Sequence, residues 1–291
     1  MATASSIPVQ APRRFNGKSA LTSTAVYIVV IAVVIVMLIP IVWLALTSIR
    51  PIVEISSVRL NILPQHPTLQ NYFTVFERYD MGMYLRTTTL ISLAVVITNL
   101  LIGAPAAYAL ARYSFFGERA LYGSIIFFRM IPPIAAIVPL FMLFEQVRLL
   151  GTFSGLIIAH TAFKLPVTIW LLRNFFLDVP RDLDDSARVD GASTLRVLFE
   201  IALPLIQPGL AATAVLAFLW TWNDLLVTLV LSTKTQTEML PLGLTKFVLE
   251  YGVDWGSMTA AGMIMFIPTL LFVFIAQRYL IAGLTLGGVK D

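Results

Sequence analysis

Long apolar stretches constrain this chain more than any other feature of its sequence. Residues 24–48 contain no charged side chain, and several later segments are nearly as apolar. A helix needs roughly 20 such residues to cross the hydrocarbon core of a bilayer. Over the whole chain 58% of residues are apolar and 12% are charged, whereas a soluble domain carries about twice that charge. The chain has too little polar surface to face water, so we expect an integral membrane protein.

Apolar stretches of sufficient length occur six times, which predicts an all-α membrane protein with six transmembrane helices. They are Thr24–Ser48, Thr88–Ala111, Leu121–Phe144, Thr152–Leu172, Leu205–Leu231 and Ser257–Ile281. In the third stretch, Pro132, Pro133 and Pro139 should bend or break the helix. Such a break serves either the packing of the bundle or a substrate, to which it offers free backbone groups. The first stretch is too long for the apolar core of a signal peptide, and we expect it to remain as an anchor.

Basic residues predict the direction in which the chain crosses the membrane. With the N-terminus in the cytoplasm, the inner segments hold eleven Lys and Arg residues and the outer segments hold seven. Because basic residues are in excess in cytoplasmic loops, both termini are expected in the cytoplasm. We divide the chain into a flexible cytoplasmic tail (1–20), a first helix with a long outer segment (21–84), a membrane domain of five helices (85–281) and a cytoplasmic C-terminal tail (282–291).

The most charged stretch, residues 178–204, lies between the fourth and fifth predicted helices. Pro180 can open a short helix there, because proline is tolerated in a first turn. Three acids follow whose charge suits the positive N-terminal end of that helix: Asp182, Asp184 and Asp185. Gly191 can then end the helix in the left-handed conformation.

A second short helix is expected directly after Gly191. Ser193 or Thr194 can cap its N-terminus. Residues at helical spacing then give it an apolar face: Leu195, Leu198, Phe199 and Ala202. The pattern predicts two short helices on the inner membrane surface, and the alternative is a solvated charged loop. We call residues 178–204 the elbow.

Three short motifs of the elbow carry a resemblance to a known family. They are Asp185-Ser186-Ala187, Asp190-Gly191-Ala192 and Ile201-Ala202-Leu203-Pro204. The elbow resembles the Glu-Ala-Ala loop of permease subunits of bacterial ABC importers, in which a glycine follows the last alanine by four residues and Ile-x-Leu-Pro comes later. Asp185 in place of Glu keeps the negative charge on a shorter side chain, and Ser186 replaces the first alanine.

The resemblance extends over about residues 85–281 and into the C-terminal tail. The tail Ala282–Lys290 and the triplet Trp222-Asn223-Asp224 resemble carbohydrate-importer permeases of the maltose-transporter kind. This resemblance implies a bacterial inner-membrane permease subunit, not an enzyme, which forms half of a path for a sugar or related polyol. The implied partners are two cytoplasmic ATPase subunits, a second, non-identical permease subunit, an extracytoplasmic substrate-binding protein and membrane lipid, with no nucleic acid. ATP and Mg²⁺ belong on the ATPase, and we expect no cofactor on this chain.

In that family the short helix of the elbow sits in a cleft of an ATPase subunit, and closure of two ATPases rocks the membrane helices from inward-facing to outward-facing. The resemblance therefore implies an ATPase-coupling role for one set of residues: Asp182, Asp184, Asp185, Ser186, Ala187, Asp190, Gly191, Ala192 and Pro204. Small side chains in this set suit insertion into a groove. The acids can pair with basic residues of the partner, and such pairs orient more than they stabilise.

Polar and aromatic residues inside the predicted spans are candidates for the translocation path, since charged residues there usually face a bundle interior or water. The candidates are Asn223, Asp224, Trp220 and Arg129. A purely structural role is the alternative, because Asp224 and Arg129 can form ion pairs within the protein. Trp220 and Trp222 can stack on a sugar ring or belong to an interfacial belt. Lys164 precedes Pro166 and can bind carbonyls that the proline frees.

Two other classes of function compete with a permease subunit. An ATP-independent secondary transporter or channel often has repeated halves, but none is evident between residues 24–144 and 152–281, and it has no use for the elbow. A membrane enzyme needs clustered nucleophiles, bases or metal ligands. Cysteine is absent, and we expect no cluster of the two histidines with the acids across spans. Gly17-Lys18-Ser19 is only a fragment of a phosphate-binding loop, since Pro12 takes the place of its first glycine.

Overall fold

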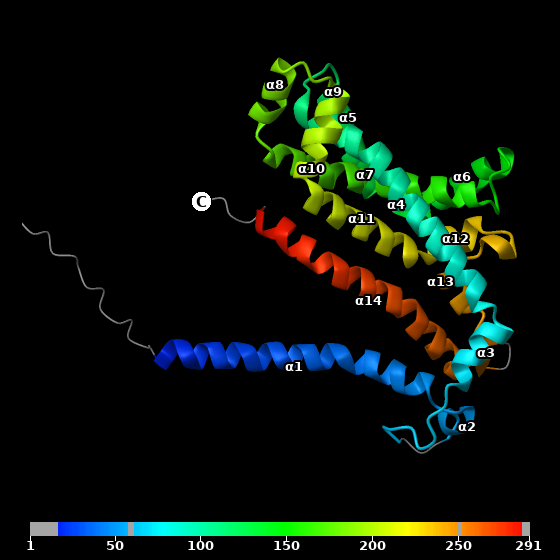
Figure 1. The fold of residues 1–291 in the computed structure, drawn as a ribbon. Helices are drawn as coiled ribbons and strands as arrows, with labels where there is room; N and C mark the ends of the chain where they lie inside the picture. Colours follow the sequence, from blue (N-terminus) through cyan, green and yellow to red (C-terminus); the bar gives the residue numbers. More distant parts are fainter. Residues whose placement is uncertain (1–16, 58–60, 250–251, 287–291) are drawn as a thin grey trace, which may run out of the picture.

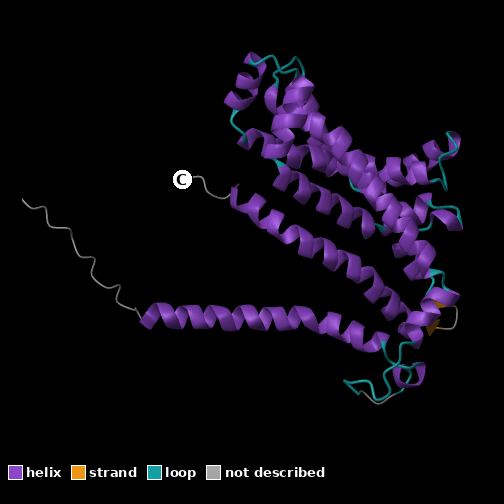
Figure 2. Cartoon of the chain, in the orientation of Figure 1, coloured by secondary structure: helices purple, strands orange, loops and turns teal. Residues whose placement is uncertain are grey.

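A computed structural model describes residues 17–57, 61–249 and 252–286 (Figure 1). Most of these residues are helical (Figure 2). The long helices are α1 (Gly17–Ser48), α4 (Met81–Arg112), α5 (Glu118–Met130), α6 (Pro133–Gln146), α7 (Phe153–Asp178), α11 (Gln207–Trp222) and α14 (Trp255–Leu286). The short ones are α2 (Ile52–Ile55), α3 (Gln70–Arg78), α8 (Arg181–Val189), α9 (Thr194–Val197), α10 (Leu203–Leu205), α12 (Leu225–Leu231) and α13 (Leu240–Thr245). A π-helix (Leu198–Ala202), a 3-10 helix (Thr235–Thr237) and the antiparallel strands β1 (Val248–Leu249) and β2 (Gly252–Val253) complete the described elements.

Four helices are long and apolar enough to cross a membrane on their own: α1, α4, α7 and α14. Two further candidates are bent pairs, because α5 meets α6 at 99° and the segment Thr194–Leu205 meets α11 at 82°. Counting each pair as one span gives six among the described residues, in agreement with the predicted all-α membrane protein. The fifth predicted span is α11 followed by α12, with an unforeseen break at Asn223 and Asp224.

The third predicted span breaks at its paired prolines. Ile131 and Pro132 are extended between α5 and α6, as expected for a residue before proline and for a proline that precedes another. Pro139 was expected to add a second interruption, but it lies inside α6. A lone proline removes one backbone hydrogen bond of a helix, and α6 continues through this loss.

The chain ends differ from the predicted tails. Because α1 begins at Gly17, the last residues of the tail predicted at 1–20 are helical, and residues 1–16 lie outside the described part. α14 continues to Leu286, so the first half of the tail predicted at 282–291 extends a helix. Residues 287–291 lie outside the described part.

Helix α1 stands apart from the rest of the bundle. It packs against α14, and the two helices diverge toward Gly17 (Figure 1). In the most apolar part of α1, none of the side chains is buried by the described residues. Its large hydrophobic side chains therefore need lipid or another protein to cover them.

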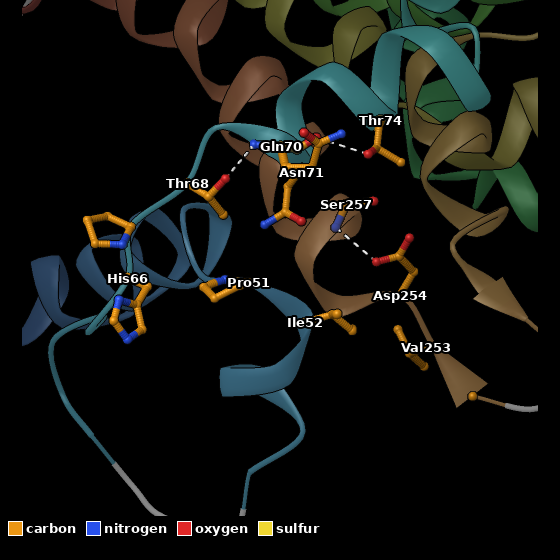
Figure 3. A pocket seen from close by; sticks show the side chains of 12 residues that line it. Pro51, Ile52, His66, Thr68, Gln70, Asn71, Thr74, Val253, Asp254 and Ser257 are labelled. Atoms are coloured by element: carbon orange, nitrogen blue, oxygen red, sulfur yellow. Dashed lines mark hydrogen bonds between the residues drawn. The ribbon is translucent and has the colours of Figure 1, made fainter.

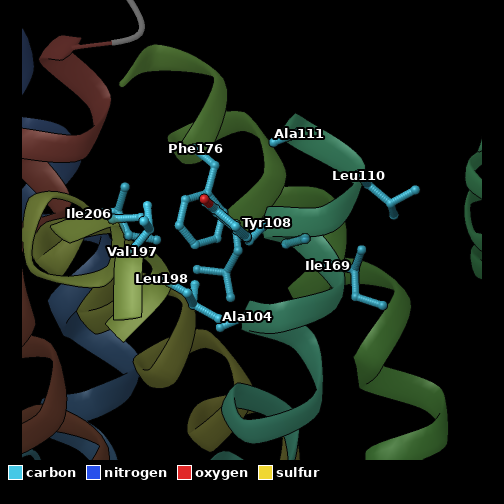
Figure 4. Close-up of a cluster of buried hydrophobic side chains, with 12 residues drawn as sticks. Ala104, Tyr108, Leu110, Ala111, Ile169, Phe176, Val197, Leu198 and Ile206 are labelled. Atoms are coloured by element: carbon cyan, nitrogen blue, oxygen red, sulfur yellow. The ribbon is translucent and has the colours of Figure 1, made fainter. Parts of the chain in front are cut away.

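Three clusters of buried side chains hold the other helices together. The first joins α4 and α7 to the elbow (Figure 4). The second joins α3, α4, α11, α13 and α14 at the end opposite the elbow, around Trp222 and Phe247. The third joins α4, α6, α7 and α12 around Leu156 and Met239. Since α4 contributes to all three, this helix links the elbow to the far end of the bundle.

Candidate functional site

The elbow contains the two short helices that the sequence predicts. α8 begins after Pro180, and Gly191 follows its end in the left-handed conformation with φ +84°. Of the two possible caps of α9, Ser193 is used, because its hydroxyl accepts a hydrogen bond from the Arg196 amide. These signals act within one turn of the chain, which is why the sequence reveals them.

The second short helix turns a different face inward from the one predicted. Leu198 and Ala202 are buried as expected, and Val197 joins them. Leu195 and Phe199 remain 65% and 57% exposed. From Leu198 to Ala202 the chain forms a π-helix, so the α-helical spacing used for the prediction does not hold over these residues.

One acid of α8 points into the protein. Asp184 is 2% exposed, and its Oδ2 accepts hydrogen bonds from Arg112 Nε at 2.8 Å and from the Tyr108 hydroxyl at 2.9 Å. The sequence prediction grouped Asp184 with the ATPase-facing acids, whereas its contacts are with α4 of the same chain. Helical spacing explains the difference, because Asp184 shares a face with Ala187, which is half-buried three residues later.

The other predicted coupling residues lie on the surface of the elbow or at its base. Gly191 and four polar residues are exposed: Asp182, Asp185, Ser186 and Asp190. Ala187 and Ala192 are half-buried and pack against the cluster drawn in Figure 4. Pro204 is exposed in α10. Val189, which the sequence did not single out, is 88% exposed at the end of α8. The outer surface of the elbow therefore combines acids with exposed apolar side chains, of which Val189 is the most exposed.

A buried polar cluster lies where the fifth span breaks. Asp224 caps α12, since its Oδ1 accepts a hydrogen bond from the Val227 amide at 3.1 Å. Its Oδ2 lies 3.0 Å from Lys164 Nζ and 3.6 Å from His160 Nδ1. Lys164 is 6% exposed and His160 is fully buried. The ion pair thus joins α7 to the break between α11 and α12.

This cluster corrects two inferences from the sequence. Histidines and acids were not expected to cluster across spans, yet His160 and Asp224 meet. Lys164 was expected to bind carbonyls freed by Pro166, but its amine donates to Asp224 and lies 3.0 Å from His160 Nδ1. The four-residue spacing of His160 and Lys164 signals that they are neighbours, whereas nothing local connects them with Asp224. In the described part of the chain, no group of three or more His, Cys, Asp or Glu is arranged to hold a metal ion.

Of the polar and aromatic candidates for the translocation path, some are exposed and one is buried. Asn223 is exposed at the break, and Trp220 is 43% exposed near the end of α11. Trp222 is 1% exposed, and its Nε1 donates to the Met265 carbonyl at 3.1 Å. Trp222 therefore packs the bundle and is not free to stack on a sugar.

Arg129 lies in an apolar cleft at the bend between α5 and α6. Its guanidinium stands over the Trp170 ring, 5.2 Å from the ring centroid, and Ile131, Pro133 and Pro166 are among the lining residues. Within the described ranges it has no acidic partner, so the ion pair considered for it does not form there. A charged residue inside a span usually faces protein or water, and a role of Arg129 in the path stays a hypothesis.

A groove at the end opposite the elbow was not foreseen from the sequence (Figure 3). It lies between α2, the segment leading into α3, β2 and the start of α14, with His66 and Asn71 among its lining residues. Asp254 accepts hydrogen bonds from the Ser257 amide at 3.1 Å and the Tyr79 hydroxyl at 3.2 Å. Burial and the Asp254 carboxylate raise the pKa of Tyr79. The groove joins residues that are far apart in the chain, so no local pattern could indicate it.

The chain is similar to known transport proteins in sequence. Residues 99–285 match the family described as the inner membrane component of binding-protein-dependent transport systems. A probable ABC transporter permease protein of Sinorhizobium fredii is 36% identical over 255 residues, which cover 88% of this chain and 91% of that protein. A trehalose transport system permease protein of Mycobacterium tuberculosis is 34% identical over 255 residues, which cover 87% of this chain and 92% of that protein.

The fold has a counterpart among solved structures. A chain in the crystal structure of a bacterial ABC transporter that imports the acidic polysaccharide alginate matches with a TM-score of 0.79. The match covers 94% of this chain and 99% of that chain at 22% identity. At this level of identity the likeness concerns the fold alone.

Proposed function

Because this chain belongs to the inner membrane components of binding-protein-dependent transport systems, we propose that it forms half of an import path for a sugar or a related polyol. The chain is a non-catalytic, multi-pass permease subunit of an ABC importer. The trehalose permease among its relatives supports a sugar as substrate. The single observation that carries coupling to an ATPase is the elbow, which is anchored on one side and presents exposed acids on the other.

The exposed side of α8 meets the cytoplasmic ATPase. Asp182, Asp185 and Asp190 are positioned to pair with basic residues of that partner, and Val189 to enter an apolar hollow. The small side chain of Ser186 leaves room for close approach. Ion pairs at such a contact orient the partners more than they stabilise them. On the opposite side of α8, Asp184 binds α4 and Ala187 packs against the cluster of Figure 4, which supports the assignment of the exposed side to the partner.

The energy for import comes from two ATPase subunits, which bind ATP and Mg²⁺, and this chain binds neither. Closure of the ATPases moves the elbows of two permeases together and shifts the membrane helices as rigid bodies between two states. The elbow and both termini face the cytoplasm. The groove of Figure 3 then faces outward, where the substrate-binding protein docks.

A second, non-identical permease subunit completes the path. The described residues leave the apolar surface of α1 uncovered, and lipid and the second permease share it. The break after α11 lies along the path, with Asn223 and Trp220 exposed to it. Asp224 holds this segment in place through Lys164, so its effect on the substrate is indirect.

Reconstitution of the complete importer tests this function. Proteoliposomes that hold this chain, the second permease, the ATPase and the loaded binding protein should take up radiolabelled disaccharides or polyols only when ATP is supplied on the ATPase side. Full uptake without ATP would identify an ATP-independent transporter or channel and overturn the proposal. ATP-dependent uptake of amino acids, with none of any sugar or polyol, would refute the substrate assignment alone.

A further inference from the structure

Helix α8 has one buried side chain, that of Asp184. The carboxylate receives its two hydrogen bonds from Arg112 and Tyr108, which both lie in the last turns of α4. Its other oxygen has no hydrogen-bond partner among the described residues. The Tyr108 ring packs edge-on against Phe176 of α7, with centroids 5.4 Å apart (Figure 4). The polar attachment of Asp184 is therefore to α4, inside an apolar cluster.

Arg112 extends this attachment to the end of α7. Its terminal amine donates to the Val179 carbonyl at 3.0 Å, while its Nε holds Asp184. The side chains of Arg112 and Asp184 are each only 3% exposed. Charge-assisted hydrogen bonds closed off from water are strong and directional. One arginine thus ties the end of α4, the end of α7 and the body of α8 together.

Two further arginines bind the same end of α4. Arg173 donates to the Leu110 carbonyl at 3.1 Å, and Arg181 donates to the Ala111 carbonyl at 3.2 Å. The last carbonyls of a helix lack helical partners and carry the negative end of its dipole, so cations are favoured there. Arg173 comes from α7 and Arg181 from α8, and both reinforce the joint around Asp184.

Helix α4 carries this joint to the opposite end of the bundle. It has 32 residues, which corresponds to a length of about 48 Å. At its start the Tyr84 hydroxyl donates to Glu238 at 3.0 Å, and the Thr88 hydroxyl accepts a hydrogen bond from the Leu240 amide at 2.7 Å. If α4 moves together with α8, the segment beyond α12 therefore moves as well, because it is hydrogen-bonded to the start of α4.

We propose that Asp184 is a positioning residue that makes α8 and α4 move as one body, so that the stroke of the ATPase reaches the far end of the bundle through α4. This inference rests on the proposed function, in which α8 meets the ATPase. Only Val179 and Pro180 connect α7 to α8 along the chain. Besides its contacts with α9 and the π-helix, α8 is held to the end of α4 and to Tyr113 by Arg181, Arg188 and Asp184, and the Asp184 joint is the buried part of this attachment. Asp184 then acts through α4 and makes no contact with the ATPase.

Three variants of the complete importer test this role. Asp184→Asn removes the charge from the joint, and Tyr108→Phe removes one hydrogen bond while it keeps the ring. The matched control is Glu200→Gln, because Glu200 forms an exposed ion pair with Arg196 at 2.8 Å on the neighbouring helix. We expect substrate imported per ATP hydrolysed to fall about tenfold in Asp184→Asn and about threefold in Tyr108→Phe. The control should match wild type, and all three should bind the ATPase with wild-type affinity.

A distance measurement separates positioning from general stability. Because the chain has no cysteine, spin labels on Leu183→Cys of α8 and Leu101→Cys of α4, both exposed positions, report the distance between the two helices. We expect one narrow distribution with and without nucleotide, and a broad one in Asp184→Asn. A distribution in Asp184→Asn as narrow as in wild type, or unchanged import per ATP, would overturn the inference.

Failure of the proposed function has a different signature. If the ATPase does not bind the elbow, the wild-type importer itself lacks ATP-dependent uptake, whatever residue stands at position 184. If Asp184→Asn does not assemble, Tyr108→Phe decides the question through the same two readouts. Wild-type import per ATP together with a narrow distance distribution in Tyr108→Phe would then refute the positioning role.

Discussion

Asp184 and Asp224 both form ion pairs, but the two pairs hold different parts of the molecule together. The side chain of Asp184 is 3% exposed and joins α8 to α4 through Arg112. The side chain of Asp224 is 21% exposed, pairs with Lys164 of α7 and also caps α12. Asp184 binds the short helix α8 to the long helix α4. Asp224 lies at the break between α11 and α12, beside the exposed Asn223.

The difference lies in what each acid holds in place. Removal of one partner from a buried ion pair leaves an uncompensated charge, which costs about 3–5 kcal/mol. At Asp184 the element set loose is the elbow, and at Asp224 it is the break between α11 and α12. We therefore expect loss of Asp184 to change import per ATP, and loss of Asp224 to change the transport path.

The largest effect is expected at the Lys164–Asp224 pair. Lys164→Met takes the cation from the Asp224 carboxylate and Asp224→Leu takes the anion from the Lys164 amine, so each should lower the free energy of unfolding by about 3–5 kcal/mol. The double variant should recover the part of this loss that comes from the unpaired charge, because neither charge remains, while the cap of α12 stays lost. Thermal unfolding in detergent measures both. Losses that simply add in the double variant would contradict the pairing.

Uptake by the Asp224→Leu importer sharpens the same comparison. We expect uptake to fall more than membrane insertion, because the break loses its cap and its tie to α7. Insertion is followed as the amount of protein in membranes, and uptake as initial rate per importer. Unchanged uptake kinetics would return Asp224 to a purely structural role.

The next effect is expected at Gly191. Gly191→Trp should insert normally but lower uptake about tenfold or more, because the ring crowds the turn that seats on the ATPase. A left-handed conformation also costs a non-glycine residue about 1–2 kcal/mol. Gly117→Trp is the matched control, since Gly117 has φ +86° and open space around it in the turn before α5. Normal uptake and substrate-stimulated ATP turnover in Gly191→Trp would contradict the role of the elbow.

A smaller effect should separate the two tryptophans near the break. Trp220→Ala should raise the KM of uptake several-fold with little change in stability, because ring stacking contributes about 0.5–1.5 kcal/mol. Its control, Trp222→Phe, loses the hydrogen bond to Met265 and should lower the free energy of unfolding by about 1 kcal/mol, with the KM unchanged. A reversal of the two outcomes would place Trp222, and not Trp220, on the path.

The smallest effect is expected for the exposed acid next to Asp184. Asp185 is 71% exposed at its side chain, and ion pairs of exposed groups contribute little. Asp185→Asn should weaken ATPase binding about two- to fivefold at low salt and less at high salt. Binding affinities at two ionic strengths measure this. A loss that is large and independent of salt would mean that Asp185 is buried at the contact.

Features that depend on one turn of chain could be predicted from the sequence. Pro132 with Pro133 breaks the third span, Gly191 ends α8, and Ser193 caps α9, since each acts on its immediate neighbours. The apolar stretches likewise predicted the four single spans and the broken third one, because length and hydropathy decide them, whereas the break within the fifth was not predicted. The motif of the elbow predicted the family, and the relatives confirm it.

Features that depend on contacts between distant residues could not be predicted. Arg112 and Asp184 are 72 residues apart, and Lys164 and Asp224 are 60 apart. No periodicity links such positions, so the partners of Asp184 and Asp224 could not be named, although helical spacing with Ala187 explains why Asp184 faces inward. The inward face of the second short helix was missed for another reason, since the π-helix at Leu198–Ala202 departs from the α-helical spacing on which the prediction relied.

A single cysteine in the elbow tests the central claim most directly. Val189 is 88% exposed at the end of α8, and Val189→Cys supplies the chain with its one thiol. In membranes that hold the complete importer, we expect a short bifunctional reagent to crosslink this position to the ATPase, and an impermeant maleimide to label it only from the cytoplasmic side. Labelling from outside the cell, with no crosslink to the ATPase, would contradict the account.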